Sequence, residues 1–215
     1  MQDPPIGQLY DRAEGPLREV LAALVPEAEL ESVAGEARAA FLRLSEEMPY
    51  ADRRDHTMFD PTFSVFQWLA VYEVLRGRGI DAHQLGRENL KLPASPGPEY
   101  TQASIERILA EAEESQRGAA ANEFVFEMLA GDEQTDGGMN VHSCAVCHAY
   151  ARHDAMELVP YMCAFDDAES AAGDMGLRRT GTIALGAHRC DFRYKRGAEP
   201  LPLAPQYPGK IRLEP

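Results

Sequence analysis

The sequence predicts an α+β fold, in which a helical N-terminal half packs on a small antiparallel sheet with two helices that carry a cysteine-rich site. Three observations predict this fold. Apolar residues recur at helical spacing through the first half, the period changes to that of a strand near Asn122, and all 4 cysteines lie between Val141 and Arg196. Nucleophiles and soft metal ligands are therefore concentrated in one quarter of the chain, where we expect the function.

The first half of the chain contains successive apolar stripes with the period of an amphipathic helix. One stripe runs from Leu17 to Leu24 and another from Val33 to Met48. Asp60 and Pro61 suit the N-cap and first residue of a third helix, because proline loses nothing where the amide has no partner. That helix should end at Gly77, and we interpret its aromatic stripe as core. Two further helices are expected, Asp81–Leu90 and one around Ile105–Ala112, separated by the proline-rich connector PASPGP.

The second half combines short strands with two helical pieces. A strand is expected at Phe124–Leu129, followed by the turn GDEQTDGG and an antiparallel return at Met139–Val141. Helices are expected at Cys144–Arg152 and Ala155–Ala171, with Asp154 as N-cap of the second. A final hairpin would pair Arg179–Leu185 with His188–Tyr194.

These elements divide the chain into three regions. They are a helical region 1–118, an α+β cysteine-containing catalytic region 119–196, and a proline-rich extended tail 197–215. At 215 residues the three regions can form one compact unit with a sizeable core and no disulfides.

Composition narrows the class of function. A net charge of −14 argues against binding to nucleic acid or to an anionic membrane, both of which need basic surface, so a small molecule is the expected partner. The N-terminus lacks the basic and apolar regions of a secretory signal, and no apolar run reaches the length of a membrane span. We therefore expect a cytoplasmic protein with reduced thiols, in which clustered cysteines are catalytic or metal-binding.

The final hairpin could carry a nucleophile and a base. If Gly186 and Ala187 form a two-residue turn, alternation places His188, Cys190 and Arg179 on one face. A thiol beside an imidazole, with an arginine at the far end, suits a nucleophile, a base and an anchor for a carboxylate. A cysteine that merely fills the core is an equally good interpretation, and a one-residue slip would dissolve the arrangement.

The other cysteines offer further chemistry. Cys163 and Asp166 share a helix face, and the carboxylate would act as a proton carrier or as a partner for a cationic substrate group, because it raises rather than lowers a thiol pKa. The run Cys144-x-x-Cys147-His148 matches the attachment signature of c-type haem, which we interpret as accidental. A structural zinc site is possible but lacks a second matching cysteine pair, so no cofactor and no metal ligand is assigned.

The chemistry-bearing residues follow one another in the order Cys144, Cys163-x-x-Asp166, Arg179-Thr180-x-Thr182 and Gly186-x-x-x-Cys190-Asp191-Phe192. This order, with the block RRTGTIALGAHRCDF, resembles the L-2-amino-thiazoline-4-carboxylic acid hydrolase family over about the last third of the chain. Cys147 and His148 are additional to the usual pattern. The resemblance implies a hydrolase that opens a cysteine-derived cyclic amidine to a carbamoyl-cysteine.

The resemblance also implies roles for individual residues. Catalysis would involve Cys163, Cys190, Cys144, Asp166 and His188. Substrate binding would involve Arg179, Thr180, Thr182 and Asp191. Which cysteine is the nucleophile stays open. Two rival functions also stay open: another reaction of a sulfur- or nitrogen-containing metabolite on this scaffold, such as C–S cleavage, and a zinc-binding or small-molecule-binding protein without catalysis.

Overall fold

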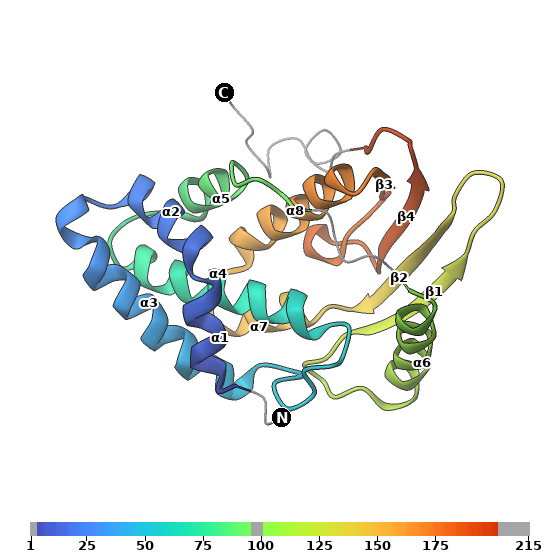
Figure 1. Cartoon of the computed structure of the whole chain (residues 1–215), viewed down its shortest axis with the longest axis horizontal. Helices are drawn as coiled ribbons and strands as arrows, with labels where there is room; N and C mark the ends of the chain where they lie inside the picture. Colours follow the sequence, from blue (N-terminus) through green and yellow to red (C-terminus); the bar gives the residue numbers. More distant parts are fainter. Residues whose placement is uncertain (1–3, 96–100, 202–215) are drawn as a thin grey trace. The chain divides into compact units, whose positions relative to one another are not determined.

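The computed structural model describes residues 4–95 and 101–201, and it confirms the α+β class. The chain divides into two units, Met1–Leu92 and Pro93–Pro215 (Figure 1). The first is helical, and the second combines helices with a four-stranded sheet. No helix among the described residues is long and apolar enough to cross a membrane.

The first unit is built around two helices that pack along each other. These are α3 (Leu30–Leu44) and α4 (Phe59–Arg76), which run side by side in Figure 1. Phe41, Phe66 and Leu69 have no exposed area, and burying each such side chain stabilises the fold by roughly 1.5–3 kcal/mol. The aromatic stripe of α4 is therefore core, as predicted. The remaining helices are α1 (Ile6–Ala13), α2 (Gly15–Leu24) and α5 (Ala82–Asn89).

The helices α5 and α4 begin in different ways. The Asp81 side chain accepts a hydrogen bond from the Gln84 backbone amide, and the Gln84 side-chain oxygen accepts one from the Asp81 backbone amide, a capping box that starts α5 one residue after the predicted helix start. The prediction of Asp60 as an N-cap was wrong, because α4 begins at Phe59 with Met58 as its N-cap. Asp60 lies instead in the first turn, where a carboxylate still interacts favourably with the helix dipole.

The second unit contains a sheet in the order β1-β2-β4-β3, antiparallel throughout. Its strands are β1 (Val125–Ala130), β2 (Gly137–Ser143), β3 (Met175–Arg178) and β4 (Cys190–Arg196). Its helices are α6 (Gln102–Gly118), α7 (Ala145–Arg152) and α8 (Val159–Ala172). The predicted hairpin across GDEQTDGG is confirmed, since Met128 pairs with Met139 between β1 and β2.

The predicted final hairpin was wrong. Strand β4 pairs with β2 on one side and with β3 on the other, so Val141 lies opposite Cys190 and Met175 lies opposite Arg196. Residues Ile183–Leu185 form a short 3-10 helix, and Gly186 follows with a φ of 93°. The glycine signal was therefore real, but it ends a helical turn rather than joining two paired strands.

The link between α7 and α8 also differs from the prediction. Asp154 was expected to cap the second helix, but it has a φ of 56° and lies in the turn after α7. A 3-10 turn, Met156–Leu158, intervenes, and α8 begins at Val159 with Pro160 in its first turn.

The boundary between the units falls at the start of the predicted proline-rich connector, part of which (96–100) lies outside the described residues. Helix α6 belongs to the second unit, where the Ser115 hydroxyl donates to the Phe126 carbonyl of β1 over 3.2 Å. The expected helical region 1–118 therefore spans this boundary. Most of the expected tail, from 202 onwards, lies outside the described residues.

Candidate functional site

The second unit brings its four cysteines together from three separate elements. Cys144 directly precedes α7 and Cys147 lies in its first turn, Cys163 lies on α8, and Cys190 begins β4. Ionisation of Cys144 raises the pKa values of Cys147, Cys163 and Cys190, so the sulfur atoms lie within electrostatic range of one another. All four are free thiols.

Cys144 occupies the N-cap of α7. The chain leaves β2 at Ser143, and Cys144 keeps an extended backbone (φ −113°, ψ 111°) while its carbonyl accepts the first helical bond, from the His148 amide at 3.1 Å. Its sulfur makes no capping hydrogen bond. The backbone amides of Cys147 and Val146 nevertheless lie near enough to the sulfur to lower its pKa. The N-terminal end of a helix favours an anion in this position.

Cys144 and Cys147 form a hydrogen-bonded pair. The side-chain hydrogen bond with Cys147 is the largest cause that lowers the pKa of Cys144, and it outweighs burial, which raises that pKa. The same bond, with burial, holds the pKa of Cys147 far above its ordinary value. The pair therefore favours a thiolate at Cys144 and a thiol donor at Cys147. Cys147 was expected outside the cysteine cluster or at its edge, and it lies beside Cys144, with which its side chain shares a hydrogen bond.

The other two cysteines lie in environments that favour the neutral thiol. Burial is the largest cause that raises the pKa of Cys163, and the nearby charge of Asp166 adds to it. Burial raises the pKa of Cys190 to about 12, even though the Ile183 amide donates to its sulfur at 3.3 Å. Neither sulfur lies at a helix N-terminus. Of the four thiols, Cys144 alone has a lowered pKa, and it alone is the N-cap residue of a helix.

A buried arginine connects α8 to the segment after β3. Arg179 is 2% exposed and donates to Asp166 at 2.7 Å, to Asp167 at 2.7 Å and to the Cys163 carbonyl at 2.9 Å. Its guanidinium also lies 4.9 Å from the centre of the Phe192 ring. Both terminal nitrogens are thus already engaged by acceptors of the protein itself.

Asp166 is the accessible member of this network. Its side chain is 39% exposed, whereas that of Asp167 is 10% exposed. Burial raises the pKa of Asp166 to about 6, and the charge of Arg179 opposes this shift. Water still reaches the carboxylate, so Asp166 can exchange protons with the solvent. Such a group can both hold and release a proton near neutral pH.

Thr180 and Asp191 bind each other. The Asp191 carboxylate accepts from the Thr180 amide at 2.8 Å, from the Gly181 amide at 2.9 Å and from the Thr180 hydroxyl. Burial raises the pKa of Asp191, but these hydrogen bonds outweigh it and lower the pKa overall. The two residues therefore fix the turn that leads from Arg179 to Thr182. Thr182 is fully buried, and its Oγ1 has no hydrogen-bond partner among the described residues.

His188 and His148 are exposed, whereas Cys144, Cys147 and Cys190 are buried. His188 is exposed in the bend before β4, and the predicted alternation that would align it with Cys190 is absent because β4 starts only at Cys190. His148 is exposed on α7 and lies 2.8 Å from the Ser143 hydroxyl. Asp166, by contrast, lies in electrostatic range of Cys144.

Sequence reasoning missed Asp167. Asp167 follows Asp166 directly and lies four residues after Cys163, so the same helix-face argument applied to it. Among the described residues, no group of three or more histidine, cysteine, aspartate or glutamate side chains is arranged to hold a metal ion.

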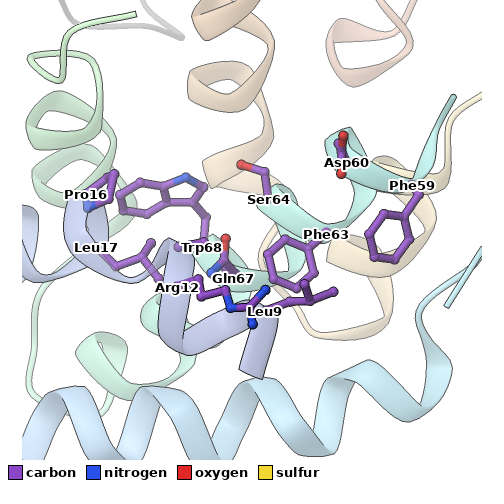
Figure 2. Close-up of a pocket in the computed structure, with 11 residues that line it drawn as sticks. Leu9, Arg12, Pro16, Leu17, Phe59, Asp60, Phe63, Ser64, Gln67 and Trp68 are labelled. Atoms are coloured by element: carbon purple, nitrogen blue, oxygen red, sulfur yellow. The ribbon is translucent and has the colours of Figure 1, made fainter. Parts of the chain in front are cut away.

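A cavity of about 470 Å³ lies in the first unit, and no predicted site residue lines it (Figure 2). Figure 2 shows Phe63, Gln67 and Trp68 of α4 along it, opposite residues of α1 and α2. Gln67 is 5% exposed, and its side-chain nitrogen has no hydrogen-bond partner among the described residues.

Comparison with known proteins identifies the family. Residues 65–194 match the family described as L-2-amino-thiazoline-4-carboxylic acid hydrolase, and this match covers more than half of the chain and all four cysteines. Searches of curated proteins and of solved structures found no significant match. The chain therefore belongs to the L-2-amino-thiazoline-4-carboxylic acid hydrolase family.

Proposed function

We propose that this protein hydrolyses a carbon–nitrogen bond of a small cyclic amidine resembling 2-amino-thiazoline-4-carboxylate, with Cys144 as the nucleophile. The family is named for a hydrolase of that compound. The observation that carries the choice of nucleophile is the position of Cys144 at the N-terminus of α7, where a lowered pKa favours its thiolate. The thiolate is the reactive form of cysteine.

The charges around Cys144 support a cationic substrate group. Asp166 and Asp167 carry two negative charges against the single positive charge of Arg179, so the network is net negative when both carboxylates are ionised. A protonated amidine is complementary to the exposed Asp166, and protonation makes its central carbon more electrophilic. Arg179, whose terminal nitrogens are engaged, then positions the two carboxylates rather than anchoring the carboxylate of the substrate.

The reaction can be written with these groups. The Cys144 thiolate forms a bond to the amidine carbon, the ring carbon–nitrogen bond breaks, and Asp166 gives the departing nitrogen a proton. Water then adds to the same carbon, loses its proton to Asp166, and expels the Cys144 thiolate. The product keeps the carbamoyl group on sulfur, as S-carbamoyl-cysteine, and one water is consumed. Cys147 donates its hydrogen bond to the Cys144 thiolate before each turnover.

The test is turnover of 2-amino-thiazoline-4-carboxylate by the full chain, followed by mass spectrometry. Cys144→Ser should lower kcat by at least about a thousandfold, as removal of a nucleophile does in other hydrolases. Cys163→Ser is the matched control, because it removes a thiol of the same cluster whose raised pKa disfavours the reactive form. If Cys144→Ser keeps the activity of the wild type, the assignment of the nucleophile is wrong.

The identity of the product separates C–N from C–S cleavage. Breaking the ring carbon–nitrogen bond leaves sulfur carbamoylated, with no free thiol in the product. Breaking the ring carbon–sulfur bond instead gives N-carbamoyl-cysteine, which reacts with a thiol reagent. Release of a reactive thiol with each turnover would refute the C–N assignment and leave the nucleophile to be judged from the Cys144→Ser result.

A further inference from the structure

We propose that Cys144 and Cys147 form a reversible intramolecular disulfide, which makes the first turn of α7 an oxidisable site of this protein. This pair goes beyond hydrolysis, because Cys147 is not needed as a nucleophile and is additional to the motif order of the family. The inference rests on where the fold places the two sulfurs and on what each can do chemically.

The geometry of a helix start suits this closure. Cys144 is the N-cap and Cys147 is the third residue of α7, so their side chains lie on the same side of the first turn. Residues three apart in a helix have Cβ atoms about 5–6 Å apart, and a disulfide needs about 3.5–4.5 Å, so closure requires a shift of about 1–2 Å. The shift can fall on Cys144, whose backbone is extended rather than helical.

The two sulfurs are already in contact and already differ in protonation. Their side chains share a hydrogen bond that favours a thiolate at Cys144 and a thiol at Cys147. A thiolate attacks a disulfide, and a neighbouring thiol resolves the product. Cys147 lies in the same helical turn as Cys144, whereas Cys163 and Cys190 come from α8 and β4, so Cys147 is the thiol best placed for the second step.

The oxidant is a low-molecular-weight disulfide. The Cys144 thiolate attacks one of its sulfurs, the sulfur–sulfur bond breaks, and one thiolate leaves and takes up a proton. Cys147 then loses its proton and attacks the Cys144 sulfur of the mixed disulfide, which expels the second thiol. The protein loses two electrons and the proton of Cys147, and the small disulfide gains two electrons and two protons, one of which comes from the solvent.

Oxidation would remove both the thiolate and its hydrogen-bond donor. If the proposed function holds, the oxidised protein cannot turn over its substrate, and a dithiol reductant restores activity. This consequence depends on the proposed function, whereas formation of the disulfide does not. Measuring the bond by mass and the turnover separately therefore distinguishes failure of one proposal from failure of the other.

The experiment uses the full reduced chain and oxidised glutathione, followed by alkylation of the remaining thiols and trypsin digestion. Cleavage after Arg117 and Arg152 leaves Cys144 and Cys147 together in one peptide, 118–152, while Cys163 and Cys190 fall in other peptides. We expect peptide 118–152 to escape alkylation and to lose the mass of two hydrogens, while Cys163 and Cys190 remain alkylated. Treatment with dithiothreitol before alkylation should restore two alkylated cysteines.

Two comparisons make the result decisive. Cys147→Ser should stop at a glutathione adduct on Cys144, because no resolving thiol remains, and the folded wild type should form its disulfide at least about tenfold faster than the same chain in urea. The inference is overturned if peptide 118–152 stays doubly alkylated, if a bond to Cys163 or Cys190 forms instead, or if folded and unfolded chains react equally fast. The wild-type peptide map decides the question even if the variant fails to fold.

Discussion

Replacement of Arg179 by lysine should destabilise the second unit by about 3 kcal/mol. Arg179 makes three hydrogen bonds, to Asp166, Asp167 and the Cys163 carbonyl, from a side chain that is almost fully buried. The single ammonium of lysine cannot reproduce the planar fork that reaches both carboxylates. Losing two bonds to charged groups costs about 1.5 kcal/mol each at the low end, and breaking a buried ion pair costs about 3–5 kcal/mol. Exposure of Asp166 favours the lower value.

The chain carries separate reporters for its two units. All 4 cysteines lie in the second unit, and the 1 tryptophan, Trp68, lies in the first. Labelling of thiols in increasing urea therefore follows unfolding of the second unit, while tryptophan fluorescence follows the first. With a urea m-value of about 1–3 kcal/mol per molar, the loss of about 3 kcal/mol in Arg179→Lys should lower the urea midpoint of thiol exposure by roughly 1–3 M.

Arg178→Lys is the matched control. Arg178 is the neighbouring residue and is exposed at the end of β3, so its replacement should change the midpoint of thiol exposure by very little. An unchanged midpoint in Arg179→Lys would show that the buried arginine does not hold α8 to the segment after β3. The proposed position of Asp166 beside Cys144 would then lose its structural support.

Three further outcomes are expected. Cys147→Ala should raise the pKa of Cys144, because it removes the hydrogen bond to the thiolate. The pH dependence of iodoacetamide labelling at Cys144 should therefore move to higher pH. An unchanged pH dependence would contradict the hydrogen bond between Cys147 and the Cys144 thiolate. Asp166→Asn should lower kcat more than it raises KM and should remove the limb near pH 6 from the profile of kcat/KM; a variant that keeps this limb would exclude Asp166 as its source. Asp191→Asn should cost about 1 kcal/mol near pH 7. Because the pKa of Asp191 is lowered in the folded state, the wild type should lose that increment as the pH falls below about 4, and the variant should not; equal acid sensitivity in urea titrations would refute this origin.

Local signals in the sequence predicted most of the elements, because those signals act over a few residues. The short helix α5, the helical stripe of α3 and the turn between β1 and β2 depend only on neighbours in the chain. The position of β4 depends on pairing with β2, more than forty residues earlier, which periodicity cannot reveal. The glycine at 186 therefore suggested a hairpin that tertiary pairing replaced.

The candidate site shows the same division. Sequence spacing placed Cys163 and Asp166 on one face of a helix, and the structure has both on α8. Spacing could not show that Arg179 is buried between Asp166 and Asp167, because this depends on how the segment after β3 crosses α8. Spacing also could not show which cysteine has the lowered pKa, since the pKa values depend on burial and on the backbone around each sulfur.

The charge of the site limits the substrates that it can favour. A negative thiolate at Cys144 beside the exposed Asp166 repels an anionic group at the reacting carbon and attracts a cationic one. Amides and thioesters are neutral there at pH 7, whereas amidines are protonated and gain from both charges. The raised pKa of Asp166 lets it hold and release a proton near neutral pH, and in the proposed reaction that proton goes to the departing nitrogen. In the proposed mechanism, recognition of the cation and cleavage of its carbon–nitrogen bond therefore use the same carboxylate, and for that reason we propose Asp166, rather than an exposed histidine, as the acid.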